Sequence, residues 1–268
     1  MSWIDAFDPH WLDELDRHAQ QTPQGLAVLL VLDAAFAPGL AEQLRQAGGS
    51  PELVWSRLPS SMSPEALAVS PLVLTYHSGH AALRAVLQTC STRPMVTAVR
   101  THESPAALAD RLARWSIVDA AGTLFHLRWA DTRRLPKLAE VLQPQQRSAL
   151  IGAAQAWWCI GRDGRWLTLP LGDGDQAMDP SAALTPPVLS PQQVAALIDD
   201  SEPDEMLAML ERELEDVWRT TRASWRHAQA SKALQEAQRC AVQELGQRLA
   251  RVRQALQSAA HWMPQESR

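Results

Sequence analysis

The chain has 268 residues, which is enough for one large domain or for one domain with an appendage. Its 46% of hydrophobic and 21% of charged residues are typical of a soluble globular protein. A net charge of −5 and a pI near 5.9 argue against nucleic acid or an anionic membrane as the main partner. No apolar run approaches the roughly 20 residues of a membrane helix, and no secretory signal opens the sequence, so we expect a cytoplasmic protein without membrane contact.

Cysteine and tryptophan usage favours packing over chemistry. The three cysteines form no C-x-x-C pair and have unrelated spacings, which predicts neither a zinc site nor disulfides. Free cysteines of this kind are usually buried, and we expect that of Cys90, Cys159 and Cys240. Among the eleven tryptophans, we assign to the core Trp129, Trp157 and Trp158.

Up to about residue 170, apolar strand patterns alternate with amphipathic helix patterns. Helices are predicted over residues 9–21, 38–47, 79–89, 105–115, 131–142 and 144–153. Strands are predicted over residues 26–32, 52–56, 72–76, 95–99, 117–118, 123–129, 156–160 and 165–169. The unbroken aliphatic run at 26–32 indicates a strand covered on both faces. Turns at Ala121-Gly122 and Asp163-Gly164 predict two hairpins. The order indicates an α/β domain with a mixed sheet.

The stretch 125–142 has the clearest local pattern, a strand that turns directly into a helix. Phe125, Leu127 and Trp129 alternate with polar residues, which predicts a half-buried strand. Asp131 stands where the N-cap of the following helix is needed, because its carboxylate can accept from free backbone N–H groups.

The rest of the chain changes character. Residues 170–187 are rich in Gly, Asp and Pro and predict a linker. Ser190-Pro191 and Glu202-Pro203 each predict a helix start, and apolar residues recur at intervals of three and four from 204 to 258. A helical hairpin that bends near 220–232 suits a compact chain better than one helix of roughly 80 Å. We therefore divide the chain into an α/β domain, a linker and an all-α C-terminal lobe, at residues 1–170, 171–189 and 190–268.

Sequence motifs for catalysis are weak. The chain has no G-x-S-x-G nucleophile motif and no phosphate-binding glycine motif, and no cofactor is expected. His77 and His80 form the best metal-like pair, but a site needs a third or fourth ligand. One alternative function is therefore a metal-dependent or serine hydrolase that uses these two histidines with a carboxylate.

Protein binding is better supported. The C-terminal helices carry charges of both signs around narrow apolar stripes. Trp218 and Trp225 are seven residues apart and would share a helical face. With Arg219 and Arg222 they are our candidate protein-binding residues, although both indoles could instead pack inside the lobe. A structural interaction module of some other cellular system is the third possibility.

Four ordered segments carry a resemblance to a known family. The first is an aliphatic strand that ends at Asp33 (residues 27–35), and the second is a strand after a proline (70–76). The third is a strand that leads into Ser-Pro and a helix (95–112), and the fourth is the 125–142 stretch with the strand after it (125–158). In this order they resemble the adaptor chaperones of bacterial type VI secretion, which load effectors onto the VgrG spike. The family places Pro directly after the Asp, whereas this chain has Thr132 there and Pro136 later, so the helix is expected to restart near Pro136.

The resemblance implies a non-catalytic adaptor that binds an effector and the spike protein, with a C-terminal helical lobe of variable sequence. It supplies no catalytic residues to transfer. We assign Asp33, Arg128 and Asp131 to the architecture, with Arg128 and Asp131 as a local ion pair and cap. The sequence leaves the cargo, the two binding surfaces and the oligomeric state open.

Overall fold

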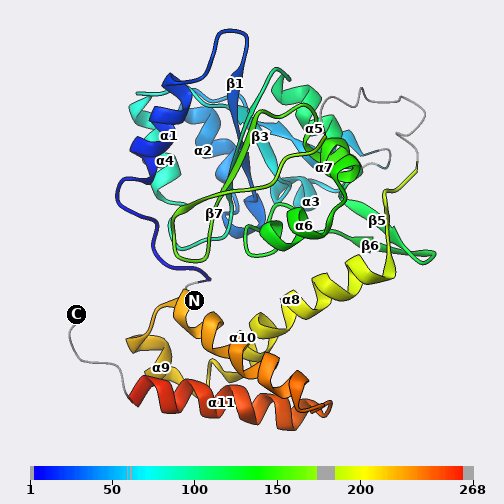
Figure 1. Cartoon of the computed structure of the whole chain (residues 1–268). Helices are drawn as coiled ribbons and strands as arrows, with labels where there is room; N and C mark the ends of the chain where they lie inside the picture. Colours follow the sequence, from blue (N-terminus) through cyan, green and yellow to red (C-terminus); the bar gives the residue numbers. More distant parts are fainter. Residues whose placement is uncertain (1–2, 59, 61, 174–184, 262–268) are drawn as a thin grey trace.

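The computed structural model describes residues 3–58, 60, 62–173 and 185–261, which form an α/β domain and a lobe of helices beside it (Figure 1). The predicted fold class, an α/β domain followed by helices, is confirmed, but the main sheet is antiparallel throughout and not mixed as predicted. Within the described ranges, no helix is long and apolar enough to cross a membrane.

The main sheet has six strands in the order β2-β3-β1-β4-β7-β8, and all neighbours are antiparallel. The strands are β1 Ala27–Leu32, β2 Glu52–Leu53, β3 Leu72–Thr75, β4 Val96–Thr101, β7 Ala156–Ile160 and β8 Trp166–Thr168. The hairpin predicted around Asp163-Gly164 is confirmed as β7 and β8.

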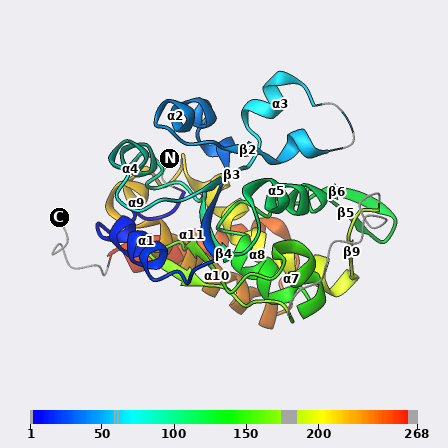
Figure 2. The ribbon, with the colours of Figure 1, turned by 90° about the horizontal axis from the view of Figure 1, so that it is seen from above.

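Both faces of this sheet are covered, as the aliphatic run of β1 predicts. Val28, Leu30 and Leu32 face one hydrophobic cluster, while Leu29 and Val31 face the other. Helices on the first face are α1 Trp11–Gln20, α2 Leu40–Gln46 and α4 Ala81–Gln88, and those on the second are α5 Pro105–Arg114, α6 Leu135–Val141 and α7 Pro144–Ile151 (Figure 2). Shorter turns are the 3₁₀ helices η1 Ala34–Phe36 and η2 Val54–Arg57 and helix α3 Pro64–Ala68. All three tryptophans assigned to the core are buried.

A second sheet protrudes from the domain. It contains β5 Ile117–Ala120 between β6 Thr123–His126 and β9 Val188–Leu189, with β9 parallel to β5. The hairpin at Ala121-Gly122 is confirmed, but every residue of β6 is exposed, so the predicted half-buried strand at 123–129 is wrong. The strand ends at His126, and Phe125 is 50% exposed on this edge strand of the second sheet.

Asp131 does not cap a long helix. Its Oδ1 accepts from the backbone N–H of Arg133 at 3.0 Å, in a turn that precedes α6. The helix begins at Leu135, with Pro136 in its first turn and no side-chain cap. The expectation that the helix restarts near Pro136 is confirmed, and the N-cap predicted at Asp131 is wrong because the chain makes one more turn first.

The lobe contains the lower part of α8 Pro191–Leu210 together with α9 Glu215–Thr220, α10 Ala223–Arg239 and α11 Leu245–His261 (Figure 1). Bends at 211–214, 221–222 and 240–244 replace the hairpin predicted to bend at 220–232, although one of them lies in that range. Pro203 is inside α8 and does not start a new helix. Because proline has no backbone N–H, Pro203 cannot donate to the carbonyl of Asp199. Arg134 donates to the neighbouring carbonyl, that of Asp200, at 3.0 Å.

Two smaller expectations also changed. Cys90 and Cys159 are buried as predicted, whereas Cys240 is exposed because it ends α10 at a bend. Of the segment predicted as a linker at 171–189, residues 174–184 lie outside the described residues, and the described end forms β9.

Candidate functional site: the domain–lobe junction

The α/β domain and the lobe have separate hydrophobic cores. The lobe core gathers residues of α8, α9, α10 and α11, with Leu210 and Val252 fully buried. Helix α8 connects the two parts, because Val194 and Leu197 pack on the domain while its C-terminal half packs in the lobe. The remaining contacts between them are largely polar, and we call this boundary the domain–lobe junction.

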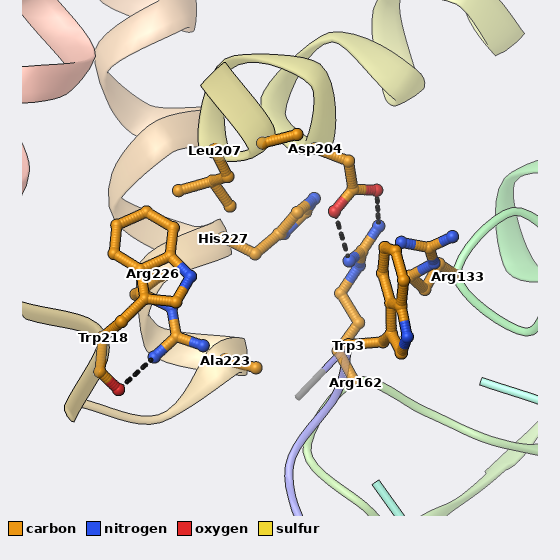
Figure 3. Close-up of a pocket in the computed structure, with 10 residues that line it drawn as sticks. Trp3, Arg133, Arg162, Asp204, Leu207, Trp218, Ala223, Arg226 and His227 are labelled. Atoms are coloured by element: carbon orange, nitrogen blue, oxygen red, sulfur yellow. Dashed lines mark hydrogen bonds and ion pairs between the residues drawn. The ribbon is translucent and has the colours of Figure 1, made fainter. Parts of the chain in front are cut away.

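Asp204 on α8 anchors the lobe to the domain. Arg162, from the turn between β7 and β8, donates to both carboxylate oxygens of Asp204 at 3.0 and 2.7 Å (Figure 3). Arg134 lies 2.9 Å from the same carboxylate and 3.6 Å from Asp200. Burial alone would raise the pKa of Asp204, but the hydrogen bonds and charge of Arg162, with the charge of Arg134, bring that pKa below its usual value. The carboxylate therefore stays ionised between two guanidinium groups.

The N-terminal strap, residues 3–9, crosses the junction from the other side. Trp3 lies under the guanidinium of Arg133, 4.8 Å from the ring centroid, and Arg133 is held by Asp131. Asp5 accepts from the backbone N–H of Ser224 at 3.0 Å and from its hydroxyl. Asp5 therefore caps the first turn of α10, a lobe helix that has no cap from its own N-cap residue.

The strap also depends on a glycine in the β7–β8 turn. The backbone N–H of Asp8 donates to the carbonyl of Gly164 at 2.9 Å. Gly164 has φ +76°, and a Cβ there would lie 2.1 Å from the carbonyl oxygen of Ala6. The strap can lie this close to the turn only because residue 164 has no side chain.

His227 on α10 lies beside the Arg162–Asp204 pair (Figure 3). Burial lowers its pKa to about 4, with the charge of Arg162 acting in the same direction and that of Asp204 opposing it; Arg133 and Arg134 also lower it. Its Nε2 is buried and has no hydrogen-bond partner among the described residues. The imidazole is therefore neutral at neutral pH.

A groove of about 560 Å³ opens along the junction. One wall is the strap with the β7–β8 turn, and the other is the connection between α9 and α10. We call it the junction groove. Its polar lining includes Asp5, Asp8 and Arg165 on the first wall, and Arg222 and Arg226 on the second. Both folding units present side chains to this cavity.

The structure brings only two of the four predicted binding residues into this groove, Trp218 and Arg222. Trp218 lies on α9 and Trp225 on α10, and each packs partly buried against the lobe core. The predicted shared face is wrong, because residue 221 adopts an extended conformation and separates the two helices. Arg219 is exposed and pairs with Asp216 at 2.9 Å on its own helix.

The architectural trio lies together at the strap side of the domain. Nη2 of Arg128 lies 3.6 Å from carboxylate oxygens of both Asp33 and Asp131. Burial raises the pKa of Asp33 to about 6; the N–H of Ala35 and the charge of Arg128 oppose this rise, and Asp131 adds to it. The ion pair predicted between Arg128 and Asp131 is present, although Arg128 itself is half exposed.

His77 and His80 line a separate cavity of about 390 Å³ that shares no lining residue with the groove. Nδ1 of His80 accepts from the backbone N–H of Leu83 at 3.3 Å, so this imidazole caps α4. In the described ranges, no group of three or more His, Cys, Asp or Glu side chains is placed to hold a metal ion.

Sequence reasoning missed the residues that build the junction: Asp5, Arg162, Asp204, Arg226 and His227. None of them belongs to a recognisable motif, because they lie in the N-terminal strap, in the β7–β8 turn or on the charged helices α8 and α10. Their partners are 42 residues away for Arg162 and 219 for Asp5. The only local signal nearby was Asp8-Pro9, which predicted the start of the first helix just after the strap.

Comparison with known protein families matches residues 28–149 to a family described as a domain of unknown function, DUF4123. This segment runs from β1 to α7 and is less than half of the chain. The family is associated with adaptors of type VI secretion effectors. Comparisons with curated proteins and with solved structures gave no significant match.

Proposed function

We propose that this protein is a non-catalytic adaptor that binds a type VI secretion effector in the cytoplasm and promotes its loading onto the VgrG spike. The α/β domain supplies the frame, and the lobe closes one side of a cargo site at the junction groove. Binding does not alter the cargo chemically. A separate surface of the protein contacts the spike.

The match of residues 28–149 to a family associated with such adaptors carries this proposal. The structure supports it through the place of the groove. Arg133 and Arg134 lie inside the matched segment and hold Trp3 and Asp204, which lie outside it. Family-matched residues thus hold the frame of the groove, while all of its lining residues except Thr92 come from segments beyond the match. This arrangement suits an adaptor whose cargo specificity differs from one protein to another.

Co-purification tests the binding claim. The full chain, tagged, is co-expressed with the candidate effector encoded beside it and with the spike protein, and the eluate is analysed for both. We expect a stable complex with the effector and recovery of the spike with that complex. Arg222→Glu, in the groove wall, should reduce effector recovery at least fivefold.

Arg251→Glu is the matched control, because Arg251 is exposed on α11 and does not line the groove. Equal loss of effector from both variants would contradict the assignment of the groove, and absence of any effector complex would refute the adaptor function. Intact-mass measurement of the effector before and after incubation tests the absence of chemistry. A cleaved or modified effector would favour the hydrolase alternative.

A further inference from the structure

Two arginines of the described chain are buried, and they are paired differently. Arg111 and Arg226 are each 4% exposed. The guanidinium of Arg111 has a carboxylate partner, with its Nε 3.0 Å from Glu103. Arg226 has no carboxylate at ion-pairing distance among the described residues. A buried charge without a counter-ion is costly, so the surroundings of Arg226 need an explanation.

The acceptors of Arg226 are neutral. Its Nη1 donates to the carbonyl of Thr221 at 2.5 Å and to that of Trp218 at 3.4 Å, and its guanidinium lies 4.9 Å from the Trp218 ring centroid. Its Nε and Nη2 have no acceptor in the described part of the chain. Burial lowers the pKa of Arg226, and Asp5 and Glu211 oppose this only at longer range. The side chain is thus held by Trp218 of α9 and by Thr221 just after it, Nε and Nη2 keep donors without a described acceptor, and the residue lines the groove.

The rim of the junction groove carries two further arginines with little to hold them. Arg222 is exposed and pairs with no described residue. Arg165 is 74% exposed at its side chain and is 3.8 Å from Asp8. The three cations come from the β7–β8 turn, the α9–α10 connection and α10, so they surround the cavity instead of lying on one helix face.

The acidic residues of the groove are engaged by the fold. Asp5 accepts from Ser224, Asp8 accepts from the N–H of His10 at 2.9 Å, and Asp163 accepts from the N–H of Arg165 at 3.1 Å. These bonds use the carboxylates as caps of turns and of a helix. Three acids and three arginines line the groove, so its formal charges balance, but Arg222 and the Nε and Nη2 groups of Arg226 have no acceptor among the described residues. Preference for an anion therefore comes from directed donors and not from net charge.

We propose that the junction groove binds an acidic peptide segment of the partner protein, with one carboxylate on Arg226 and others on Arg222 and Arg165. This inference rests on the proposed function and adds the chemistry of the cargo segment. A cavity of about 560 Å³ is far larger than one carboxylate group needs and lies within the range of about 300–1,000 Å³ usual for ligand sites. Arginine fits a carboxylate by two parallel N–H···O bonds, which Nε and Nη2 of Arg226 can supply.

Fluorescence anisotropy with fluorescein-labelled hexaglutamate tests the proposal on the full chain. We expect saturable binding that weakens with added salt, and no binding of labelled hexaglutamine or hexalysine. Arg165→Glu combined with Arg222→Glu should weaken hexaglutamate at least tenfold, whereas Arg251→Glu should change it less than twofold. Arg226→Met should abolish binding, and Arg226→Lys should restore part of it.

Circular dichroism of each variant shows whether the lobe has kept its helices. If Arg226→Met does not fold, the exposed pair Arg165→Glu and Arg222→Glu still decides the matter. The inference is overturned if hexaglutamate does not bind, if hexaglutamine binds equally, or if the double variant binds as the wild type does. Competition by citrate at the same concentration as hexaglutamate would overturn the assignment to a peptide. An effector that co-purifies with a protein unable to bind hexaglutamate would refute this inference and leave the proposed function intact.

Discussion

Replacing His227 by glutamine should remove a contribution that destabilises the folded protein as the pH falls. Folding lowers the pKa of His227 from 6.5 to about 4, so between these values the unfolded chain binds more protons than the folded one. Burying the neutral imidazole costs nothing in protonation free energy above pH 6.5. As the pH falls from 6.5 toward 4, protons bind the unfolded chain in preference, and the folded state loses stability. Between pH 7 and pH 5 this contribution amounts to about 2 kcal/mol, which taken alone would lower the Tm of a chain of this size by about 4–8 °C. Glutamine does not titrate and should not show this loss.

Another group masks the effect in the wild type. The pKa of Asp33 is raised on folding from 3.8 to about 6, so its protonation stabilises the folded state by about 1 kcal/mol over the same pH interval. The wild type alone should therefore change little, and the informative quantity is the difference between the variant and the wild type. The free energy of unfolding of both proteins is measured in urea at pH 7 and at pH 5.

His227→Gln should gain about 2 kcal/mol relative to the wild type when the pH is lowered. His10→Gln is the control, because His10 is exposed with its side chain 83% accessible, and its difference from the wild type should stay constant. The NMR signal of the His227 ring, assigned by its loss in the variant, should still report a neutral imidazole at pH 5. A constant difference for His227→Gln, or a ring that protonates near pH 6.5, would refute the reasoning.

Three further predictions concern the same region. Asp33→Asn should remove the gain of about 1 kcal/mol in unfolding free energy that the wild type obtains from Asp33 when the pH falls from 7 to 5. Urea unfolding at the two pH values checks this. If the variant and the wild type show the same change of stability with pH, burial does not penalise the charged form of Asp33. Asp5→Ala should lower stability by about 1 kcal/mol and speed hydrogen exchange in the first turn of α10, because Ser224 loses its cap; exchange limited to other helices would count against the cap. Gly164→Ala should destabilise by about 1–3 kcal/mol and separate the strap from the turn, because a Cβ would meet the carbonyl of Ala6; an unchanged Tm would disprove that contact.

The strands of the main sheet could be predicted because short stretches of sequence determine them. The aliphatic run in β1 has side chains on both faces, and both faces are covered by helices with the expected spacing. The turn at Gly161–Gly164 is encoded by Asp-Gly, which supplies the positive φ found at Gly164. Such signals require nothing from distant residues, so a single sequence contains them.

Local pattern failed where tertiary contacts decide the backbone. The chain between α9 and α10 contains neither Pro nor Gly, yet the helix ends at Thr220. The hydroxyl of Thr221 donates to the carbonyl of Val217, and Arg226 donates to the carbonyl of Thr221. The opposite failure occurred at Pro203, where α8 continues through the proline and a guanidinium from the α/β domain lies at the same turn. Neither arginine can be assigned to these roles before the fold is known.

The candidate site was predictable only in part for the same reason. Trp218 and Arg222 were identified as binding residues from composition and helical spacing, and the structure places both in the groove wall. The groove itself exists because the strap, the β7–β8 turn and the lobe meet, and no periodicity in the sequence describes that meeting. The charge that distinguishes it, Arg226, belongs to an ordinary charged helix by pattern and became notable only through its burial.

The bond between Asp5 and Ser224 has a consequence for synthesis of the chain. These partners are separated by 219 residues, so the strap leaves the ribosome long before the helix that it caps. At about 5–20 residues per second, the delay is roughly 10–40 s. During that interval the α/β domain can complete its own core, while Asp5 and Trp3 do not yet have contacts with residues of the lobe. The junction can therefore close only after the α/β domain has been synthesised, and the groove forms only on a chain whose translation has passed α10.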